Sequence, residues 1–223
     1  MALPIRFTTL GCRRIAGLPK AMKNPRFFSA SAISMARISE AIKDDHRELE
    51  QAYNNIINAK TSEDKTKWRN QFTWELARHS IGEELVVYPQ FEKYLPDGHD
   101  MAQKDREEHL QVKKLLYKFQ DLTPEHADFE STLQSLWSEL KEHINEEENY
   151  DLKALEEKLD QAQSESMVNS FNRTKKFIPT RSHPSAPDKP PFETVAGLLT
   201  APIDHLRDIF RSFPDDSKSQ MPP

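Results

Sequence analysis

The chain has 223 residues, a formal net charge of −5 and 30% charged residues. Its five glycines and abundant Glu, Lys, Leu and Ala favour helices, and the acidic balance argues against nucleic-acid binding as its main task. The lone Cys12 excludes an internal disulfide and a thiolate metal cage. No apolar run is long enough to cross a membrane.

The N-terminal segment differs from the rest of the chain. Residues 1–39 contain seven Lys or Arg residues but no Asp or Glu, with Ser, Ala and Phe between them. We expect residues 1–36 to be a mitochondrial transit peptide, with a disordered basic arm as the alternative. The run Arg26–Ser31 resembles a processing site. Initiation at Met35 would instead produce a cytoplasmic form.

Two amphipathic helices are predicted next, at about 38–59 and from Thr61 to Pro89. Apolar residues recur at steps of three and four in both. Thr61 and Ser62 are suitable N-caps for the second helix, and Pro89 should end or kink it. The inward-facing residues of the two helices are Ile42, His46, Leu49, Tyr53, Ile56, Trp68, Phe72, Leu76, His79, Glu83 and Val86.

Two further helices follow the turn at residues 96–98. The third is predicted over about 100–120, and residues 123–125 (Thr-Pro-Glu) give a start signal for the fourth. Their inward-facing residues are His109, Val112, Leu116, Phe119, Phe129, Leu133, Leu136, Leu140, His143, Glu147, Tyr150 and Ala154. The pattern predicts an all-α, antiparallel up-down-up-down four-helix bundle over residues 37–161, with flexible N- and C-terminal extensions.

Beyond residue 161 the helical pattern fades. Residues 162–223 are predicted to be a Pro-rich tail, and residues 162–191 in particular a tail or linker. A short helical segment is expected near 195–213, where Pro202 could open a small helix. This segment either docks on the bundle or binds a protein partner, whose identity the sequence leaves unknown.

Polar residues interrupt the inward face of every predicted helix. His79 with Glu83, and His143 with Glu147, are each four residues apart, so each pair projects to one side of its helix. Buried imidazoles and carboxylates need a shared partner, and a pair of metal ions can provide it. Without thiolates the set suits iron or manganese, and also zinc. The predicted metal ligands are His46, His79, Glu83, His109, His143 and Glu147.

Several neighbours are expected to play no direct part in this site. Lys113 is predicted to face water, and Tyr53 and Tyr150 to pack near the site, with donation to a metal-bound ligand as the alternative. Four acids are predicted to lie in solvent unless one of them orients an imidazole. These acids are Asp45, Glu84, Glu146 and Glu148.

The order His, His-xxx-Glu, His, His-xxx-Glu resembles the hemerythrin-like, or HHE cation-binding, family. The four helical signatures match at 45–49, 79–84, 108–109 and 143–148, and the resemblance covers about residues 38–160. The tail is similar to those of fungal members. The resemblance implies an oxo- or hydroxo-bridged di-iron centre. By position, His46 and His79 would bind one iron, His109 and His143 the other, and Glu83 and Glu147 would bridge them.

Two positions depart from the oxygen-carrying hemerythrins. Those proteins have another His one turn after the third helix's His, where this chain has Lys113, which argues against reversible oxygen carriage. Their second bridging acid lies five residues after the last His, at Glu148 here. Glu147 continues the inward face and is preferred, and Glu148 remains the alternative.

The first functional hypothesis is a non-haem di-iron protein that handles iron or binds or senses O2, NO or peroxide. One alternative is a di-iron enzyme of the peroxidase or oxidase type. Another is an interaction protein with a structural metal site. The sequence has no substrate-pocket signature, which favours a binding protein over an enzyme.

Overall fold

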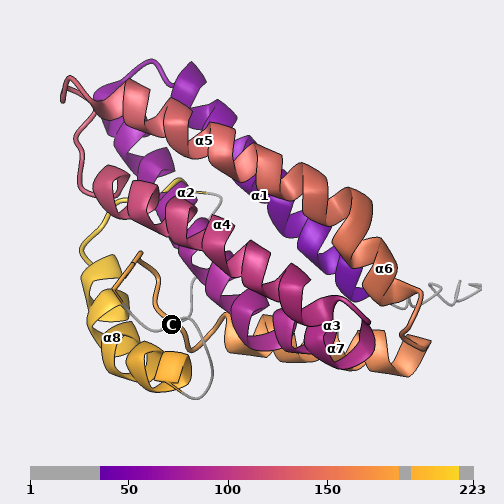
Figure 1. Ribbon diagram of the computed structural model, residues 1–223. Helices are drawn as coiled ribbons and strands as arrows, with labels where there is room; N and C mark the ends of the chain where they lie inside the picture. Colours follow the sequence, from indigo (N-terminus) through magenta and orange to yellow (C-terminus); the bar gives the residue numbers. More distant parts are fainter. Residues whose placement is uncertain (1–35, 186–191, 216–223) are drawn as a thin grey trace, which may run out of the picture. The chain divides into compact units, whose positions relative to one another are not determined.

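Figure 1 shows the computed structural model, which describes residues 36–185 and 192–215. The expected transit peptide and the alternative start at Met35 lie outside the described residues. All regular structure in the described part is helical. The four long helices of the bundle are α1 (Ile38–Asn58), α2 (Ser62–Val86), α4 (Gly98–Phe119) and α5 (Phe129–Glu146).

Helix α1 packs along α2, and α4 packs along α5 and also contacts α2. The predicted all-α bundle is therefore confirmed. Thr61 caps α2, because its hydroxyl oxygen accepts the backbone N–H of Asp64 at 3.0 Å. The short joint between α1 and α2 makes the two helices antiparallel neighbours.

A short helix, α3 (Tyr88–Tyr94), separates α2 from α4, with Pro89 in its first turn. The predicted break near Pro89 is thus confirmed. Gly98 begins α4 with its Cα against the end of α3. A Cβ there would lie 1.8 Å from the backbone oxygen of Phe91, so only glycine fits this joint.

The start of α5 differs from its prediction. Residues 123–128 form two successive turns, in which His126 N–H donates to Thr123 O and Phe129 N–H donates to His126 O. The predicted start at residues 123–125 is therefore wrong, and regular helix begins at Phe129. Residues that suit an N-cap also suit turns, and in this chain residues 123–128 form a separate loop.

The second half of the last bundle helix contains an irregularity. After α5 the chain forms one π-helical turn, η1 (Glu147–Asp151), and continues as α6 (Leu152–Glu156). The Leu152 N–H donates to Glu147 O, five residues back. Such turns insert one residue into an α-helix and shift the side chains that follow.

Residues 161–174 are not a linker, contrary to prediction. They form α7 (Gln161–Thr174), which begins with a capping box between Asp160 and Gln163 and packs on α2 and α1. Its Phe171 is fully buried. Gly82 of α2 makes room for this ring, because a Cβ at that position would lie 2.7 Å from it.

The last described segment docks on the bundle. Helix α8 (Phe192–Asp208) contains Pro202 in its interior, so the prediction that Pro202 opens a helix is wrong. The Asn70 side chain of α2 donates to Ser212 O at 2.8 Å, and Ser182 N–H donates to the Gln120 side chain at 3.0 Å. Phe213 is 3% exposed.

The core of the bundle is in two parts. One apolar cluster surrounds Leu76, Leu116 and Leu136, and the other surrounds Ile42, Phe91 and Leu152. The layer of polar residues predicted as metal ligands divides the two. Within the described residues, no helix combines the length and apolar character that a membrane span requires.

Candidate metal centre

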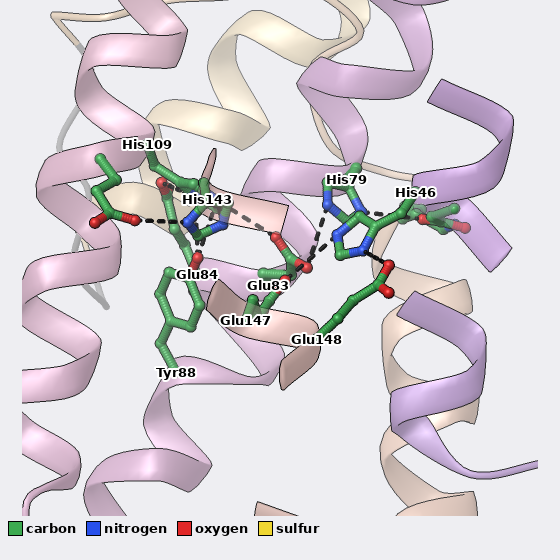
Figure 2. Close-up of polar contacts among 12 residues, drawn as sticks. His46, His79, Glu83, Glu84, Tyr88, His109, His143, Glu147 and Glu148 are labelled. Carbon is green, nitrogen blue, oxygen red and sulfur yellow. Dashed lines mark hydrogen bonds and ion pairs between the residues drawn. The ribbon is translucent and has the colours of Figure 1, made fainter. Parts of the chain in front are cut away.

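The structure brings all six predicted ligands together in one buried layer (Figure 2). Helix α1 contributes one imidazole, α2 an imidazole and a carboxylate, α4 one imidazole, and α5 with η1 an imidazole and a carboxylate. None is more than 2% exposed. The six residues are His46, His79, Glu83, His109, His143 and Glu147.

The Nε2 atoms of the imidazoles point toward the two inner carboxylates. His79 Nε2 lies 3.2 Å from one oxygen of Glu83, and His109 Nε2 lies 3.5 Å from the other. His46 Nε2 lies 3.4 Å from Glu147, and His143 Nε2 lies 3.0 Å from His109 Nε2. These contacts define two halves of the site with Glu83 between them.

The inner donor atoms are largely unsatisfied. Among the described residues, no hydrogen-bond partner reaches Nε2 of His46 or His79, nor either carboxylate oxygen of Glu83 or Glu147. Burial of such groups without partners is costly. Two sets of three residues, one with His46 and His79 and the other with His109 and His143, could each hold a metal ion, and both include Glu83. The donor set therefore fits a pair of cations.

Each imidazole is held from behind by a carboxylate on a neighbouring helix. The Nδ1 atoms of His46, His109 and His143 lie 2.9, 3.1 and 2.9 Å from these carboxylates, and that of His79 lies 3.4 Å away. Since an ionised carboxylate only accepts, Nδ1 carries the hydrogen and Nε2 faces inward with its lone pair. The pairs are Asp45–His79, Glu84–His109, Glu108–His143 and Glu148–His46.

These four pairs join the helices in a closed ring. Asp45 links α1 to α2, Glu84 links α2 to α4, Glu108 links α4 to α5, and Glu148 links η1 back to α1. Helix α7 also braces the ring, because Lys175 Nζ donates to both oxygens of Asp45 at 2.5 and 2.6 Å.

Sequence reasoning placed several of these groups wrongly. Asp45, Glu84 and Glu148 do not lie free in solvent. Each contacts an imidazole, which matches the alternative that such an acid orients a histidine. Only Glu146 of the four acids is on the surface, where it pairs with Lys104. Glu108 was noted only as part of the family signature at 108–109, and no role in orienting an imidazole was predicted for it.

The prediction for Lys113 is also wrong, because its ammonium pairs with the buried Glu84 rather than facing water. Tyr150 is 68% exposed, so it faces solvent rather than packing near the site as predicted. Tyr53 stacks on Trp137 at 4.4 Å between ring centroids, as a packing residue. The tyrosine at the site is the fully buried Tyr88, whose hydroxyl lies 2.9 Å from His109 Nε2.

The π-helical turn separates the roles of Glu147 and Glu148. Glu147 is fully buried and contacts His46 Nε2 on the inner side. Glu148 contacts Nδ1 of the same imidazole on the outer side, 2.9 Å away, and also pairs with Arg47. The inward position preferred for Glu147 is thus the one it occupies.

Burial sets the protonation of the inner groups. It lowers the pKa of His79 and of His109 to about 4, so both imidazoles are neutral at pH 7. Burial, together with the charge of Glu147, raises the pKa of Glu83 well above its usual range. Burial acts in the same direction on Glu147, but the close contact with His46 and the nearby imidazoles lower its pKa to about 2. Neutral imidazoles are the form that a metal requires.

The family model described as the hemerythrin HHE cation binding domain matches residues 37–155, more than half of the chain. This chain belongs to the hemerythrin family. Its HHE domain is a cation-binding domain by description, and the matched range contains all six inner residues.

Two relatives match this chain to different degrees. An uncharacterized hemerythrin-like protein of Schizosaccharomyces pombe is 54% identical over 191 residues, covering 84% of this chain and 94% of that protein. A DNA nickase of Nostoc sp. is 22% identical over 144 residues, covering 65% of this chain but only 40% of that protein. No solved structure matches this chain.

Proposed function

We propose that this hemerythrin-like protein holds a pair of iron ions and, through them, binds a small molecule such as O2, NO or peroxide or handles iron. His46 and His79 would hold one ion, His109 and His143 the other, and Glu83 and Glu147 would lie between them. The observation that carries this proposal is the set of inward-facing, buried donor atoms without hydrogen-bond partners in the described part of the chain.

Iron is chosen over zinc and manganese on family grounds, since imidazole and carboxylate donors suit all three. Bound iron would supply an open coordination position for a diatomic ligand or peroxide. The protein's own part is to hold the imidazoles in one orientation through the outer carboxylates and to exclude water with the surrounding apolar clusters.

Metal content of the full chain, purified anaerobically, tests this proposal. We expect about two irons per chain, with magnetic coupling between them by Mössbauer or electron paramagnetic resonance spectroscopy. The variant His79→Ala should lose half or more of the iron, whereas His126→Ala, in the exposed 123–128 loop, should retain it. Zinc or no metal after anaerobic iron loading would refute the iron proposal.

A ligand role is tested separately with the iron-loaded protein. We expect addition of NO or peroxide to change the optical spectrum, and Tyr88→Phe to alter the stability of the complex, because the phenol is the nearest buried O–H donor described at His109. An unchanged spectrum with all of these ligands would favour iron handling over ligand binding.

An enzyme of the peroxidase or oxidase type is the second candidate. The observation that favours it is the buried Tyr88 hydroxyl at His109, with Lys113 in place of a further imidazole. Turnover of peroxide by the iron-loaded protein that is lost in Glu83→Gln would support an enzyme. A lack of turnover by the wild-type protein would exclude this candidate.

We also propose that the protein acts in mitochondria. The support is the acid-free, basic composition of the N-terminal segment. Import of the full chain into isolated mitochondria, followed by N-terminal sequencing, should find a cleavage site between residues 26 and 36. Replacement of Arg6, Arg13 and Arg14 by Gln should reduce import. Full retention of the uncut chain outside mitochondria would contradict the proposal.

A further inference from the structure

A second cluster of metal-ligating side chains lies outside the inner layer. Asp105 and Glu108 of α4 face His143 of α5, and one donor atom from each of the three lies within 4.8 Å of the others. Asp105 is only 2% exposed, and its Oδ2 atom has no hydrogen-bond partner among the described residues. A buried, unsatisfied carboxylate oxygen of this kind calls for a cation.

Acidic side chains lead from this cluster to the surface. The side chains of Glu146 and Glu108 are 40% and 31% exposed, whereas Asp151 and Asp105 are 5% and 2% exposed as residues and Glu147 is 0% exposed. Burial and the charges of Glu147 and Asp151 raise the pKa of Asp105 from 3.8 to about 9, so a cation that binds there displaces a proton. The acids therefore extend from the surface to the inner ring in order of decreasing exposure.

The surface end of this series already holds a positive charge. Lys104 Nζ pairs with Glu146 and lies 3.5 Å from Glu108 Oε1, and its side chain is 51% exposed. A solvent-exposed ammonium is a counter-ion that a divalent cation can displace, because two carboxylates attract a double charge more strongly.

We propose that Asp105 and Glu108, beside the Nδ1 face of His143, form an outer site for divalent metal ions, through which these ions reach the six inner ligands. The inference rests on the proposed function, since an entry site needs a metal centre to supply. The ligands of this outer site are the oxygens of the two carboxylates, which suit Fe²⁺, Mn²⁺ or Co²⁺, because His143 directs its Nδ1 hydrogen at Glu108. Fewer donors than in the inner ring make the outer site the weaker one, so an ion held there can move inward.

Metal uptake by the full chain, stripped of metal with a chelator, tests the entry site. Co²⁺ is the probe, because its visible absorption reports coordination by nitrogen and oxygen, and stopped-flow mixing gives the rate. We expect Asp105→Asn to slow both Co²⁺ uptake and its chelator-driven release about tenfold, because Asn lacks the carboxylate that would hold the ion at the outer site. The final amount of cobalt per chain and its equilibrium affinity should be unchanged, because a site on the entry route changes the rates of uptake and release by the same factor.

Glu107→Gln is the matched control. Glu107 adjoins Glu108 on α4 but is exposed and pairs with Gln103. Its replacement by Gln therefore removes one negative charge from the same helix without changing a residue of the cluster. We expect its uptake rate to equal that of the wild type. Glu108→Gln, at a partly exposed position, is the second variant and should also slow uptake. Circular dichroism establishes that each variant is folded.

The outcomes are distinguishable. Wild-type rates in both Asp105→Asn and Glu108→Gln would overturn the entry site while leaving the metal centre intact. A weaker cobalt affinity with an unchanged uptake rate would show that these acids only orient His143, and this result would also overturn the entry site. A wild-type chain that takes up no cobalt or iron would refute the proposed function itself, and the entry site with it.

Discussion

At the scale of single residues, the site depends on carboxylates with distinct positions. Glu147 and Glu148 are adjacent in the chain and both contact His46, but on opposite nitrogens of its ring. Glu147 is fully buried among unsatisfied donors, whereas the Glu148 side chain is 16% exposed and paired with Arg47. The two positions therefore predict different consequences of the same substitution.

We expect Glu147→Gln to lose at least one metal ion per chain, because it would remove a carboxylate that the proposed centre shares between its two ions. Glu148→Gln should retain both ions with an affinity lower by about 10- to 100-fold, because it only loosens the His46 ring. Elemental analysis and chelator competition measure the two effects. Equal metal loss in both variants would contradict the separate roles.

A second residue-scale prediction concerns pH. Glu75 of α2 is 6% exposed, and burial raises its pKa from 4.5 to about 7. A carboxyl with a raised pKa in the folded state contributes stability below about pH 4.5, and this contribution disappears as the pH rises through 7. The loss corresponds to about 3 kcal/mol.

Glu75→Gln should remove this dependence, since its amide can still accept the hydrogen bond from Gln71. We expect the free energy of unfolding of the variant to exceed that of the wild type at pH 8 but not at pH 4.5. Urea titrations at both pH values measure it. A constant difference between the two proteins across this range would show that Glu75 does not titrate there.

At the scale of elements, the sequence predicted the bundle and the inward positions of the six candidate ligands, because both follow one helical period. The inward faces of the four long helices were readable from steps of three and four. The outer carboxylates were not, because each flanks the inward face and acquires its role only from the position of a neighbouring helix. Asp45 orients the imidazole of His79, for example, and not that of the adjacent His46.

Helix α7 was missed for a different reason. Its sequence is mostly polar, and the residues that bury it are few: Ser164, Met167, Val168 and Phe171. The capping box formed by Asp160 and Gln163 was the available signal. Pro residues beyond it drew the interpretation toward a linker, although they follow the helix and do not interrupt it.

The packing of α7 on α2 gives a prediction whose sign is diagnostic. Gly→Ala within a helix usually stabilises by about 0.5–1 kcal/mol. Gly82→Ala should instead lower the free energy of unfolding by about 1–3 kcal/mol, because its Cβ would overlap the Phe171 ring. Denaturant unfolding measures this change. The double variant Gly82→Ala with Phe171→Leu should recover part of the loss, and a stabilised single variant would refute the close packing.

At the scale of the whole molecule, the segment after α7 is attached to the bundle through specific contacts. Thr180 donates to Asp208 at 2.6 Å within the segment, and Arg181 pairs with Asp121 at the end of α4. Ser182 donates its hydroxyl hydrogen to the backbone oxygen of Lys113 at 2.6 Å, and the ammonium of the same lysine pairs with Glu84. The attachment thus reaches the direct partner of one of the four outer carboxylates.

Phe213 anchors this segment, and its replacement should detach it. We expect Phe213→Ala to increase hydrogen exchange and proteolytic cleavage within residues 178–185 and 192–215 without affecting α1 to α5, because Phe213 is 3% exposed. Phe210→Ala is the matched control, since that ring is 84% exposed. Equal protection of both variants would show that Phe213 does not secure the segment.

The ring of four carboxylate–imidazole pairs also governs how the molecule can come apart. It lies between two separate apolar clusters, so each end of the bundle can in principle open as its own cooperative unit. No bundle helix can slide along its axis without breaking two of the four pairs. A metal pair inside the ring would couple the unfolding of the two ends of the bundle. Loss of metal should therefore uncouple two partial unfolding events that coincide in the loaded protein.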